Sequence, residues 1–502
     1  MAVDPATIAL SLISHTNVGK TTLARTLLRR DIGEVRDEAH VTMEAERHTL
    51  LEVPADARLE LWDTPGLGDS VRLARRLAGR ANPIGWFLSE VWDRFRDRPF
   101  WSSQRAIRNI LEQADVVLYL INAAEAPADV GYLDAELEVL GLLGKPVVVL
   151  LNQMGPPRGP DREAAEIERW RQRTRNAACV RTVLAFDAFA RCWVQEDVLL
   201  EAVGRALRAD RAAAFDTLRA AWRTRNRATW RAAMQLLADR LARAALDRET
   251  VQPEGWTGRL RSIGTALGLR REGALTPREY AMQALAERLD ADIRSSTDRL
   301  IELHGLEGKA TGIVLTRLAE HYGVREPLNE GKAALWGGVV TGALAGLKAD
   351  LAAGGLTMGA GLLAGGVLGA LGAAGLARGY NLVRGVDAPT LNWSTTVLDE
   401  LVRSALLGYL AVAHYGRGRG NWTAAEHPEF WQEHVNAVIA MDGERLRDLW
   451  KQRETRANRP EGKGDGASTT DRAGPELTAA LEAWLSQASD ALLARLYPNA
   501  RF

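Results

Sequence analysis

Short apolar runs separated by helix-length polar segments fill residues 1 to about 200. The runs are Thr7–Ile13, Leu59–Trp62, Val116–Ile121, Val147–Leu151 and Val180–Phe186. Apolar runs of about four to eight residues bounded by turn signals predict buried strands, and helical crossovers between them predict a mostly parallel sheet flanked by helices. The pattern therefore predicts an α/β domain over residues 1–200.

The pattern changes after about residue 200, where strand-like runs give way to helical spacing. Phe215, Leu218 and Trp222 recur at intervals of three and four residues, which is typical of an amphipathic helix. Thr276 followed by Pro277 predicts a helix start, because an N-cap threonine and a first-turn proline favour that position. We therefore predict an all-α C-terminal region in five parts. They are a helical domain over 201–330, a glycine-rich block over 331–385, helices continuing over 386–450, a flexible linker without large apolar residues over 451–475, and a C-terminal helix over 476–502.

Glycine is concentrated in the block 331–385, which holds 16 of the 46 glycines. Two uncharged stretches fill much of it, Ala333–Leu347 of 15 residues and Leu351–Ala377 of 27 residues. A membrane-spanning helix needs about 20 apolar residues, so only the second stretch is long enough. Small residues at every fourth position allow two helices to approach closely, a packing favoured in bilayers. The pattern predicts a helical hairpin that either associates with a membrane or lies buried within the C-terminal region.

Composition excludes several classes of protein. Hydrophobic residues make up 46% and charged residues 25% of the chain, which excludes global disorder, and the presence of only two cysteines excludes a disulfide scaffold. The 64 basic and 64 acidic residues cancel, so charge gives no reason to expect nucleic acid as a partner. No basic residue precedes Lys20, so we expect no secretory or transit signal. The expected location is the cytoplasm, with peripheral or integral attachment to the cytoplasmic membrane if the block 331–385 enters it.

A phosphate-binding loop follows the first predicted strand. Residues 14–22 read S-H-T-N-V-G-K-T-T, which fits the pattern G-x-x-x-x-G-K-[ST] except that Ser14 replaces the first glycine. In such a loop, backbone N–H groups and a helix N-terminus surround the phosphates, the lysine contacts the terminal phosphates, and the next hydroxyl binds Mg²⁺. Only 7 of the 64 basic residues are lysines, so a lysine at position 20 indicates a specific chemical requirement, including a part in catalysis. We expect the nucleotide to contact Asn17, Val18, Gly19, Lys20, Thr21 and Thr22, and the metal to contact Thr21.

A second motif, Asp63-Thr64-Pro65-Gly66, follows the predicted strand that ends at Trp62. An aspartate at the carboxyl end of a strand can hold Mg²⁺ through water, and a glycine three residues later can offer its N–H to the γ-phosphate. Alone the sequence is a common turn, but downstream of a phosphate-binding loop it indicates the same site. We therefore expect Asp63 to bind nucleotide and metal, and Gly66 to bind nucleotide and take part in catalysis.

These residues resemble the Era-like branch of the P-loop GTPases, which belongs to the TRAFAC class. The resemblance implies an α/β P-loop GTPase domain with GTP and Mg²⁺ as cofactors. Gly33-Glu34-Val35 and the later Val41-Thr42 resemble that branch's switch region, which implies that Thr42 binds Mg²⁺ in the triphosphate state and is a catalytic residue. Leu67 stands where Ras-type switches place a water-orienting glutamine. A hydrophobic residue there is usual in the Era-like branch and implies slow intrinsic hydrolysis.

The motif expected to recognise the base is altered. The family pattern after the fifth strand is Asn-Lys-x-Asp, whereas residues 152–155 read Asn-Gln-Met-Gly. The family's aspartate accepts hydrogen bonds from guanine N1–H and from the exocyclic amine, and Gly155 offers no carboxylate. Either another side chain replaces it, with Asp161 and Asp187 as candidates, or base selectivity is loose. Asn152 is expected to bind nucleotide, although an asparagine there can also serve only to cap the strand end.

The whole chain is similar to a set of uncharacterised bacterial proteins that join an Era-like GTPase domain with an altered base motif to a helical, glycine-rich domain of unknown function. The similarity rests on Gly33-Glu34-Val35, Leu118–Ala123 and the stretch from Gly346 to Gly361. The leading hypothesis is a switch that hydrolyses GTP slowly and acts at a membrane lipid or membrane protein through residues 331–385, with self-association as a further option. The alternative is a nucleotide-binding scaffold with negligible hydrolysis, and a third reading is a membrane-inserting effector under nucleotide control.

Two further segments have open interpretations. One segment is rich in aromatic residues, namely Trp86, Trp92, Phe95, Phe100 and Trp101. It forms either a helical insertion that packs its aromatic side chains or a docking surface controlled by the nucleotide. Residues 205–248 hold eleven arginines and four aspartates, which indicates either a solvated helix surface or a face for an anionic partner.

Overall fold

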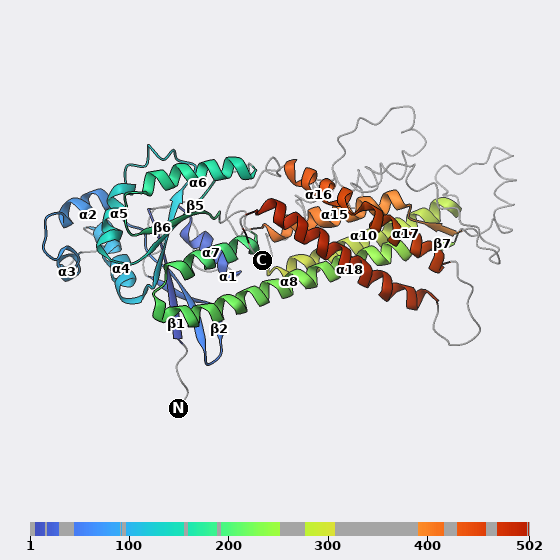
Figure 1. Ribbon diagram of the computed structural model, residues 1–502, viewed down its shortest axis with the longest axis horizontal. Coiled ribbons are helices and arrows are strands. Elements are labelled where there is room, and N and C mark those ends of the chain that lie inside the picture. The colour runs from blue at the N-terminus through green and yellow to red at the C-terminus, as the bar shows by residue number, and fades with distance from the viewer. Residues whose placement is uncertain are drawn as a thin grey trace, which may run out of the picture.

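The computed structural model shows an α/β domain joined to a helical region (Figure 1). The residues that it describes are 6–15, 18–29, 45–90, 92, 97–154, 159–187, 192–250, 277–306, 390–415, 429–457, 469–498 and 500. Asn17, Thr42, Phe95 and Gly155 lie outside these ranges, as does the glycine-rich block 331–385. What the sequence predicts for those residues stays a prediction.

A six-stranded sheet forms the centre of the α/β domain, with the strand order β2-β3-β1-β4-β5-β6. The strands are β1 (Ala6–Ser14), β2 (Glu46–Val53), β3 (Ala57–Asp63), β4 (Val116–Asn122), β5 (Val147–Asn152) and β6 (Val180–Ala185). All neighbouring pairs are parallel except β2 and β3, which are antiparallel. The predicted mostly parallel sheet is therefore confirmed, and each of the five predicted apolar runs forms a strand.

The apolar pattern did not reveal β2. This strand lies at one edge of the sheet, where Leu50 is buried while Glu46, Arg47 and Thr49 are exposed. An edge strand is covered less completely than a central one, so it needs no continuous apolar run.

Helices cover both faces of the sheet. They are α1 (Lys20–Leu28), α2 (Ser70–Leu77), α3 (Pro83–Ser89), α4 (Arg98–Gln113), α5 (Leu133–Leu142), α6 (Pro160–Thr174) and α7 (Trp193–Ala206). Leu23 of α1 and Leu199 of α7 pack in the core on one face. Leu73 of α2, Leu137 of α5 and Trp170 of α6 pack in the core on the other face. The α/β fold predicted from the alternating pattern therefore has the expected layers.

The aromatic segment after the second motif forms the helical insertion α2–α4. Phe87 and Phe100 are fully buried, and the ring of Trp92 lies 5.6 Å and 4.8 Å from their ring centroids. Arg76 covers the outside of this cluster, with its guanidinium carbon 4.9 Å from the Phe100 ring centroid. These contacts favour the interpretation as a packed insertion, and docking of a partner stays a prediction.

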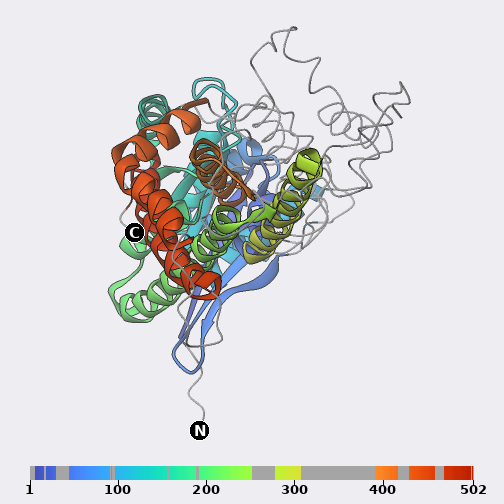
Figure 2. The same cartoon turned by 90° about the vertical axis from the view of Figure 1, so that its right-hand side faces the viewer.

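One long helix connects the two parts of the molecule. The helix α8 (Ala212–Leu246) has 35 residues and runs from the sheet into the helical region beside α18 (Thr469–Leu496), as both views show (Figures 1 and 2). Its first half buries Phe215 and Trp222 in the core of the α/β domain, whereas its second half buries Trp230 and Leu237 in the core of the helical region. The predicted change near residue 200 is therefore a change of architecture without a break in packing.

The helical region contains four further helices and a short sheet within the described residues. They are α10 (Pro277–Leu303), α15 (Thr395–Ala413), α16 (Glu429–Met441) and α17 (Gly443–Ala457), with the antiparallel pair β7 (Arg248–Thr250) and β8 (Thr390–Asn392), and a 3-10 turn over Ala209–Arg211 precedes α8. The predicted helix start at Pro277 is confirmed.

The predicted flexible linker over 451–475 is too long. Helix α17 continues to Ala457, and α18 begins at Thr469, before the helix start expected at 476. Arg453 is buried, and its guanidinium donates to the carbonyl oxygens of Ala245 at 3.0 Å and Trp393 at 2.9 Å. A segment without large apolar residues can still form helix when its arginine, glutamate and alanine residues favour that state and one long side chain anchors it.

Within the ranges that the structure describes, no helix is both long and apolar enough to cross a membrane. The stretch Leu351–Ala377, which carries the membrane prediction, lies outside those ranges.

Candidate nucleotide-binding site

The predicted phosphate-binding loop connects the end of β1 to the start of α1. Gly19, the last residue before α1, has a φ of 91°, a left-handed conformation that glycine adopts without strain. A Cβ at this position would also lie 2.8 Å from the Asn152 side-chain nitrogen. The N-cap residue Gly19 has no side chain, and no other side chain among the described residues caps the N-terminus of α1, which leaves its first N–H groups suited to an anion.

Lys20 crosses from the first turn of α1 to the end of β1. Its Nζ donates to Ser14 Oγ at 2.9 Å and lies 3.2 Å from where a Cβ on Gly66 would stand. Burial lowers the pKa of Lys20, and the nearby carboxylates of Asp63 and Glu136 oppose that shift. The two motifs found in the sequence therefore meet around one buried ammonium group.

Thr21 and Asp63 place their side-chain oxygens together beside Lys20. The Thr21 hydroxyl donates to Asp63 Oδ2 at 2.7 Å, and Asp63 is only 2% exposed. Burial raises the pKa of Asp63, an effect that Lys20 partly cancels, and Asp63 Oδ1 has no hydrogen-bond partner among the described residues. Hydroxyl and carboxylate oxygens suit Mg²⁺, and a buried carboxylate oxygen without a partner fits a place for that ion.

The backbone after Asp63 is fixed between β1 and α4. Leu67 N–H donates to Ser14 O at 3.1 Å, and Gly68 N–H donates to Ser103 Oγ at 3.1 Å. A Cβ on Gly68 would lie 2.6 Å from Pro99 Cα, so this close approach requires glycine. The Leu67 side chain is fully buried and, being aliphatic, offers no hydrogen bond to a nucleotide.

Asn152 supports the phosphate-binding loop from the end of β5. It is fully buried, and its Nδ2 donates to Val18 O at 2.7 Å. The interpretation of Asn152 as no more than a strand cap is therefore too narrow, because its side chain reaches across to another loop.

The two aspartates proposed for the base lie in different surroundings. Asp187, just after β6, accepts a hydrogen bond from Met154 N–H at 3.0 Å through Oδ2. Asp161 is exposed in the first turn of α6. Of the two candidates, Asp187 is the one placed against the altered motif.

Sequence reasoning missed a buried network behind the phosphate-binding loop. His15 Nδ1 lies 2.7 Å from Glu136 Oε1, and Tyr119 OH donates to Glu136 Oε2 at 2.6 Å. The His15 ring also stacks on Tyr132, with 3.9 Å between the ring centroids. Glu136 gave no distinct signal in the sequence, because α5 also contains Asp134 and Glu138, and its partner His15 lies 121 positions away.

The opposite end of α1 contacts the helical region. Arg29, which follows α1 in a left-handed conformation, donates through Nη2 to Asn226 Oδ1 of α8 at 2.6 Å. Its Nη2 also lies 3.6 Å from Glu196 Oε2 of α7, and a Cβ on Gly305 would lie 3.5 Å from Arg29 Cβ. Trp222 Nε1 donates to the same Glu196 oxygen at 2.8 Å. The helix that follows the phosphate-binding loop thus ends where the α/β domain meets the helical region.

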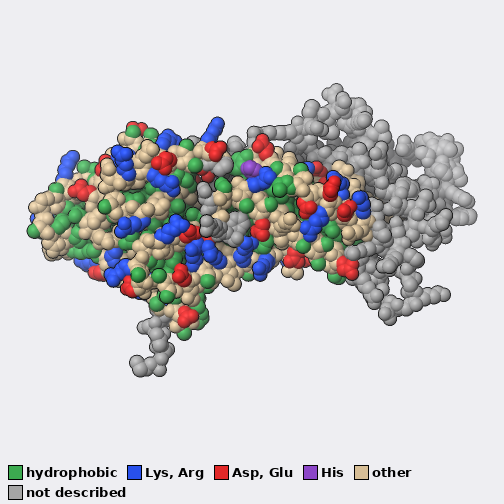
Figure 3. All heavy atoms as spheres, viewed as in Figure 1, with side chains coloured by type: hydrophobic (Ala, Val, Ile, Leu, Met, Phe, Trp, Pro, Cys, Tyr) green, Lys and Arg blue, Asp and Glu red, His purple; other side chains and the backbone are tan. Residues whose placement is uncertain are grey.

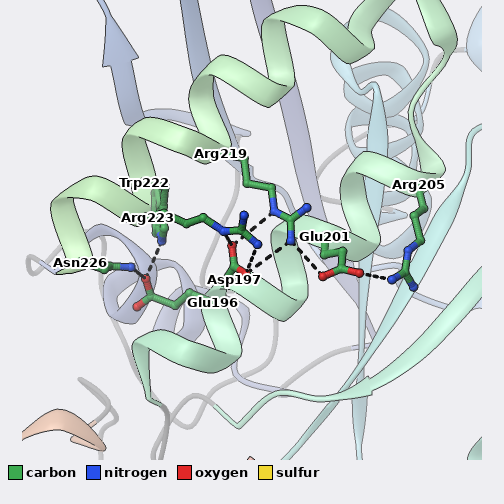
Figure 4. A network of polar contacts seen from close by, with 8 residues as sticks. All are labelled: Glu196, Asp197, Glu201, Arg205, Arg219, Trp222, Arg223 and Asn226. Carbon is green, nitrogen blue, oxygen red and sulfur yellow. Dashed lines mark hydrogen bonds and ion pairs between the residues drawn. The ribbon is translucent and has the colours of Figure 1, made fainter. Parts of the chain in front are cut away.

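Several arginines of the stretch 205–248 bind carboxylates of α7 (Figure 4). Arg223 donates to both oxygens of Asp197 at 2.7 Å, and Arg219 donates to Glu201 at 2.9 Å. Basic and acidic side chains are interspersed on the face drawn in Figure 3. These contacts favour a structural role for this stretch over a face for an anionic partner.

No group of three or more metal-ligating His, Cys, Asp or Glu side chains exists in the described part of the chain. A site built from one hydroxyl and one carboxylate, with phosphates supplying further oxygens, is consistent with that finding because Mg²⁺ is often bound through one or two carboxylates plus substrate phosphates.

Comparison with protein families finds two matching models. Residues 10–153 match a model described as 50S ribosome-binding GTPase, and residues 314–483 match a domain of unknown function (DUF3482). The comparison with curated proteins found no match.

The chain is similar to three solved structures, two of Era and one of a bacterial dynamin pair. Era in complex with MgGDPNP and nucleotides 1506–1542 of 16S ribosomal RNA is 19% identical, with a TM-score of 0.31 over 41% of this chain and 58% of that chain. An Aquifex aeolicus Era variant bound to GDP·AlF4⁻ is 20% identical, with a TM-score of 0.29 over 40% of this chain and 57% of that chain. An oligomerised bacterial dynamin pair is 11% identical, with a TM-score of 0.22 over 98% of this chain and 69% of that chain. This chain thus spans less than two thirds of the length of the two Era chains.

The N-terminal part of the chain matches a GTPase family model over residues 10–153, and the phosphate-binding loop and the Asp63–Gly66 motif lie within that match. The domain of unknown function over residues 314–483 agrees with the similarity noted for the helical region.

Proposed function

We propose that the protein binds GTP with Mg²⁺, hydrolyses it slowly, and uses its helical region to report which nucleotide is bound. The observation that carries the proposal is the convergence of Lys20, Thr21, Asp63 and Gly66 beside the N-terminus of α1. Burying an ammonium group and a carboxylate is costly, and an anionic ligand together with a divalent cation offsets that cost. A buried site of this composition therefore fits a magnesium nucleotide.

Each predicted residue has a role in this proposal. Lys20 neutralises charge on the β- and γ-phosphates, and backbone N–H groups of residues 17–22 surround the phosphates. Thr21, Asp63 and, by resemblance, Thr42 hold Mg²⁺, which when bound neutralises charge that develops on the phosphates. Gly66 offers its N–H to the γ-phosphate, and Asn152 keeps the loop at Val18 in position.

Hydrolysis is proposed to be slow because Leu67, the residue after Gly66, has no polar group that could orient the attacking water. Leu67 follows Gly66 and is fully buried, so it cannot polarise water near the γ-phosphate. In GTPases an added arginine accelerates hydrolysis by about 10³- to 10⁵-fold, which shows how much a missing group can matter. An activating partner or a second copy of the chain would therefore raise turnover.

The nucleotide state is proposed to reach the helical region through α1. Arg29 precedes the segment that resembles the switch region, and it contacts Asn226 of α8 and Glu196 of α7. A change in the conformation of the switch therefore alters the chain next to Arg29. Because α8 belongs to the cores of both parts, a shift at this joint reaches the helical bundle.

The output is proposed to act at a membrane through the glycine-rich block 331–385. Its stretch Leu351–Ala377 has 27 uncharged residues, which exceeds the about 20 residues that a spanning helix needs. Nucleotide-dependent exposure of this block would make membrane binding depend on GTP. A hairpin buried in the helical region is the competing arrangement.

Two measurements test the proposal. Purified full-length protein should release phosphate from GTP in a Mg²⁺-dependent manner at a low rate, and no release above that of an Asp63→Asn control would contradict a hydrolysing switch and favour the scaffold. Cell fractions extracted with carbonate or detergent, with and without a GTP analogue, should place part of the protein with membranes. Complete recovery in the aqueous fraction in both cases would remove the membrane from the account.

A further inference from the structure

We infer that Asp187 supplies the carboxylate that recognises guanine, in place of the aspartate that Gly155 has replaced. The inference rests on the proposed function, because it assigns the base selectivity of that same site. Asp187 lies outside the phosphate-binding loop, outside the motif Asp63–Gly66 and outside the altered base motif at residues 152–155.

A guanine site must satisfy two adjacent donors. Guanine presents N1–H and the exocyclic amine along one edge, and a single carboxylate accepts from both, whereas adenine presents an acceptor at N1. A site whose polar groups are left unpaired by the wrong base rejects that base strongly. Residues 152–155 contain side-chain amides at Asn152 and Gln153 but no carboxylate, so the acceptor must come from another loop.

The base end of the site is located by contacts of β5. Ligands in open α/β sheets bind at the carboxyl ends of the strands, and Asn152 ends β5 there. Its Nδ2 donates to Val18 O at 2.7 Å, which ties the end of β5 to the phosphate-binding loop. Gln153 Nε2 lies 3.9 Å from where a Cβ on Gly19 would stand. Residues 152–154 therefore lie beside the loop that surrounds the phosphates.

Strand pairing brings Asp187 to this same edge. Strand β6 is parallel to β5, with Ala185 opposite Leu151, and Phe186 N–H donates to Leu151 O at 3.0 Å. Asp187 is the next residue, and its Oδ2 accepts from Met154 N–H at 3.0 Å. Its carboxylate is thus hydrogen-bonded to Met154, one residue before Gly155. Position 155 is where the family pattern has its aspartate.

The hydrogen bond from Met154 N–H engages one of the acceptor sites of the Asp187 carboxylate. An ionised aspartate has two oxygens and about four lone-pair sites, so it can accept from several donors at once, and Met154 N–H is one of them. Asp187 is half-buried, which strengthens its hydrogen bonds relative to those of the exposed Asp161. In this inference, the carboxylate that recognises guanine comes from the chain after β6 and not from the loop after β5.

A purely structural role for Asp187 predicts a different outcome for one substitution. Asp187→Asn keeps an oxygen that can accept from Met154 N–H, so the loop should stay in place. The amide nitrogen, however, places a donor against the exocyclic amine of guanine and matches xanthine, which has a carbonyl where guanine has its amine. Base recognition therefore predicts exchanged selectivity, whereas a loop support predicts none.

The test uses the full-length protein and competition between GDP, XDP and ADP in Mg²⁺, with Asp161→Asn as the matched control. Asp187→Asn should weaken GDP binding by about 10- to 100-fold, the range for loss of a bidentate base contact, while XDP gains affinity and ADP is unchanged. The control should bind GDP as the parent does. The inference is overturned if Asp187→Asn leaves GDP affinity unchanged, or if it weakens all three nucleotides alike.

A second measurement needs no substitution and covers the case of a variant that does not fold. IDP lacks the exocyclic amine, so the parent protein should bind it more weakly than GDP by about 10-fold, and it should reject XDP more strongly. Equal affinity for GDP and IDP overturns the inference. Failure of the proposed function is recognised separately, because the parent would then bind none of these nucleotides in a way that depends on Lys20.

Discussion

The phosphate end and the base end of the nucleotide site are built differently. At the phosphate end, the loop needs a glycine at position 19, a lysine at position 20 and the N-terminus of α1, which all lie within one short stretch of chain. At the base end, selectivity is proposed to rest on one carboxylate, that of Asp187, which follows β6 and contacts the chain after β5. Phosphate binding can therefore be predicted from one motif, whereas base recognition depends on which loops the fold brings together.

The largest expected effect is at the phosphate end. Lys20→Ala should lower the affinity for GTP and GDP by roughly 150-fold, or about 3 kcal/mol, because it removes a buried charge that faces the phosphates. The thermal unfolding temperature without nucleotide should stay near that of the parent, since burial of the ammonium is itself costly. Isothermal titration calorimetry measures the affinity.

Lys451→Ala is the matched control for this change, because Lys451 lies on α17 and its Nζ contacts Asp448 at 3.0 Å on an exposed surface. Equal nucleotide affinity for Lys20→Ala and the parent, with both proteins folded, would contradict the phosphate assignment.

The helical region differs from the nucleotide site in how it holds buried ionisable groups. Lys20 is a buried ammonium group, whereas burial favours the neutral form of His304 and His414. Burial lowers the pKa of His304 and of His414 to about 4, from an unfolded value of about 6.5. Between those values the unfolded chain binds more protons, so the free energy of unfolding should decrease as pH falls from about 6.5 to 4. The loss is about 3 kcal/mol at most for each histidine.

Urea unfolding at pH 7 and pH 5 measures this dependence. A variant with His304→Gln and His414→Gln should be less stable at pH 7, because His414 Nε2 lies 2.6 Å from Tyr497 OH, and should show a weaker pH dependence. An unchanged pH dependence would contradict the role of these histidines.

A smaller effect separates support of the loop from recognition of the base. Asn152→Ala should weaken GDP and ADP alike by about 10-fold, because the lost hydrogen bond to Val18 O supports the phosphate-binding loop for either base. Competition titrations of the two nucleotides measure the ratio. Asn122→Ala is the control, since Asn122 ends β4 and binds Glu125 at 3.0 Å. Loss of GDP affinity alone would show that Asn152 reads the base directly.

The smallest expected effect concerns the loop after Asp63. Ser102 Oγ donates to Gly66 O at 3.3 Å, so Ser102→Ala should lower GTP turnover by about fivefold, the equivalent of one ordinary hydrogen bond, and leave GDP affinity unchanged. Single-turnover phosphate release measures the rate. The control is Ser89→Ala, because Ser89 Oγ binds Trp86 O within α3. Equal rates for the two variants would show that α4 does not fix the position of Gly66.

The sequence predicted the elements whose signal is local. Five strands were predicted because each is a continuous apolar run, and the start of α10 was predicted from Pro277. Strand β2 was missed because an edge strand mixes exposed polar and apolar residues. The linker over 451–475 was predicted too long because its helix ends lack large apolar residues, and the anchoring contacts of Arg453 come from distant parts of the chain.

The candidate site shows the same division. Lys20, Thr21, Asp63 and Gly66 were predicted from two motifs, and the structure brings them together. The contact of His15 with Glu136 could not be predicted, because no pattern connects residues 121 positions apart. Spacing alone also could not choose between Asp161 and Asp187, since that choice depends on the parallel pairing of β5 and β6.

The central claim, a guanine-nucleotide site that rests on Lys20, is tested most directly by competing GTP and ATP for the same purified protein. Full-length protein and its Lys20→Ala variant would be titrated with both nucleotides in Mg²⁺, and turnover of each nucleotide would be followed in the same samples. The account predicts that the parent prefers GTP to ATP and turns it over slowly, and that the variant loses both properties. A clear preference for ATP, or equal binding of GTP by parent and variant, would contradict it.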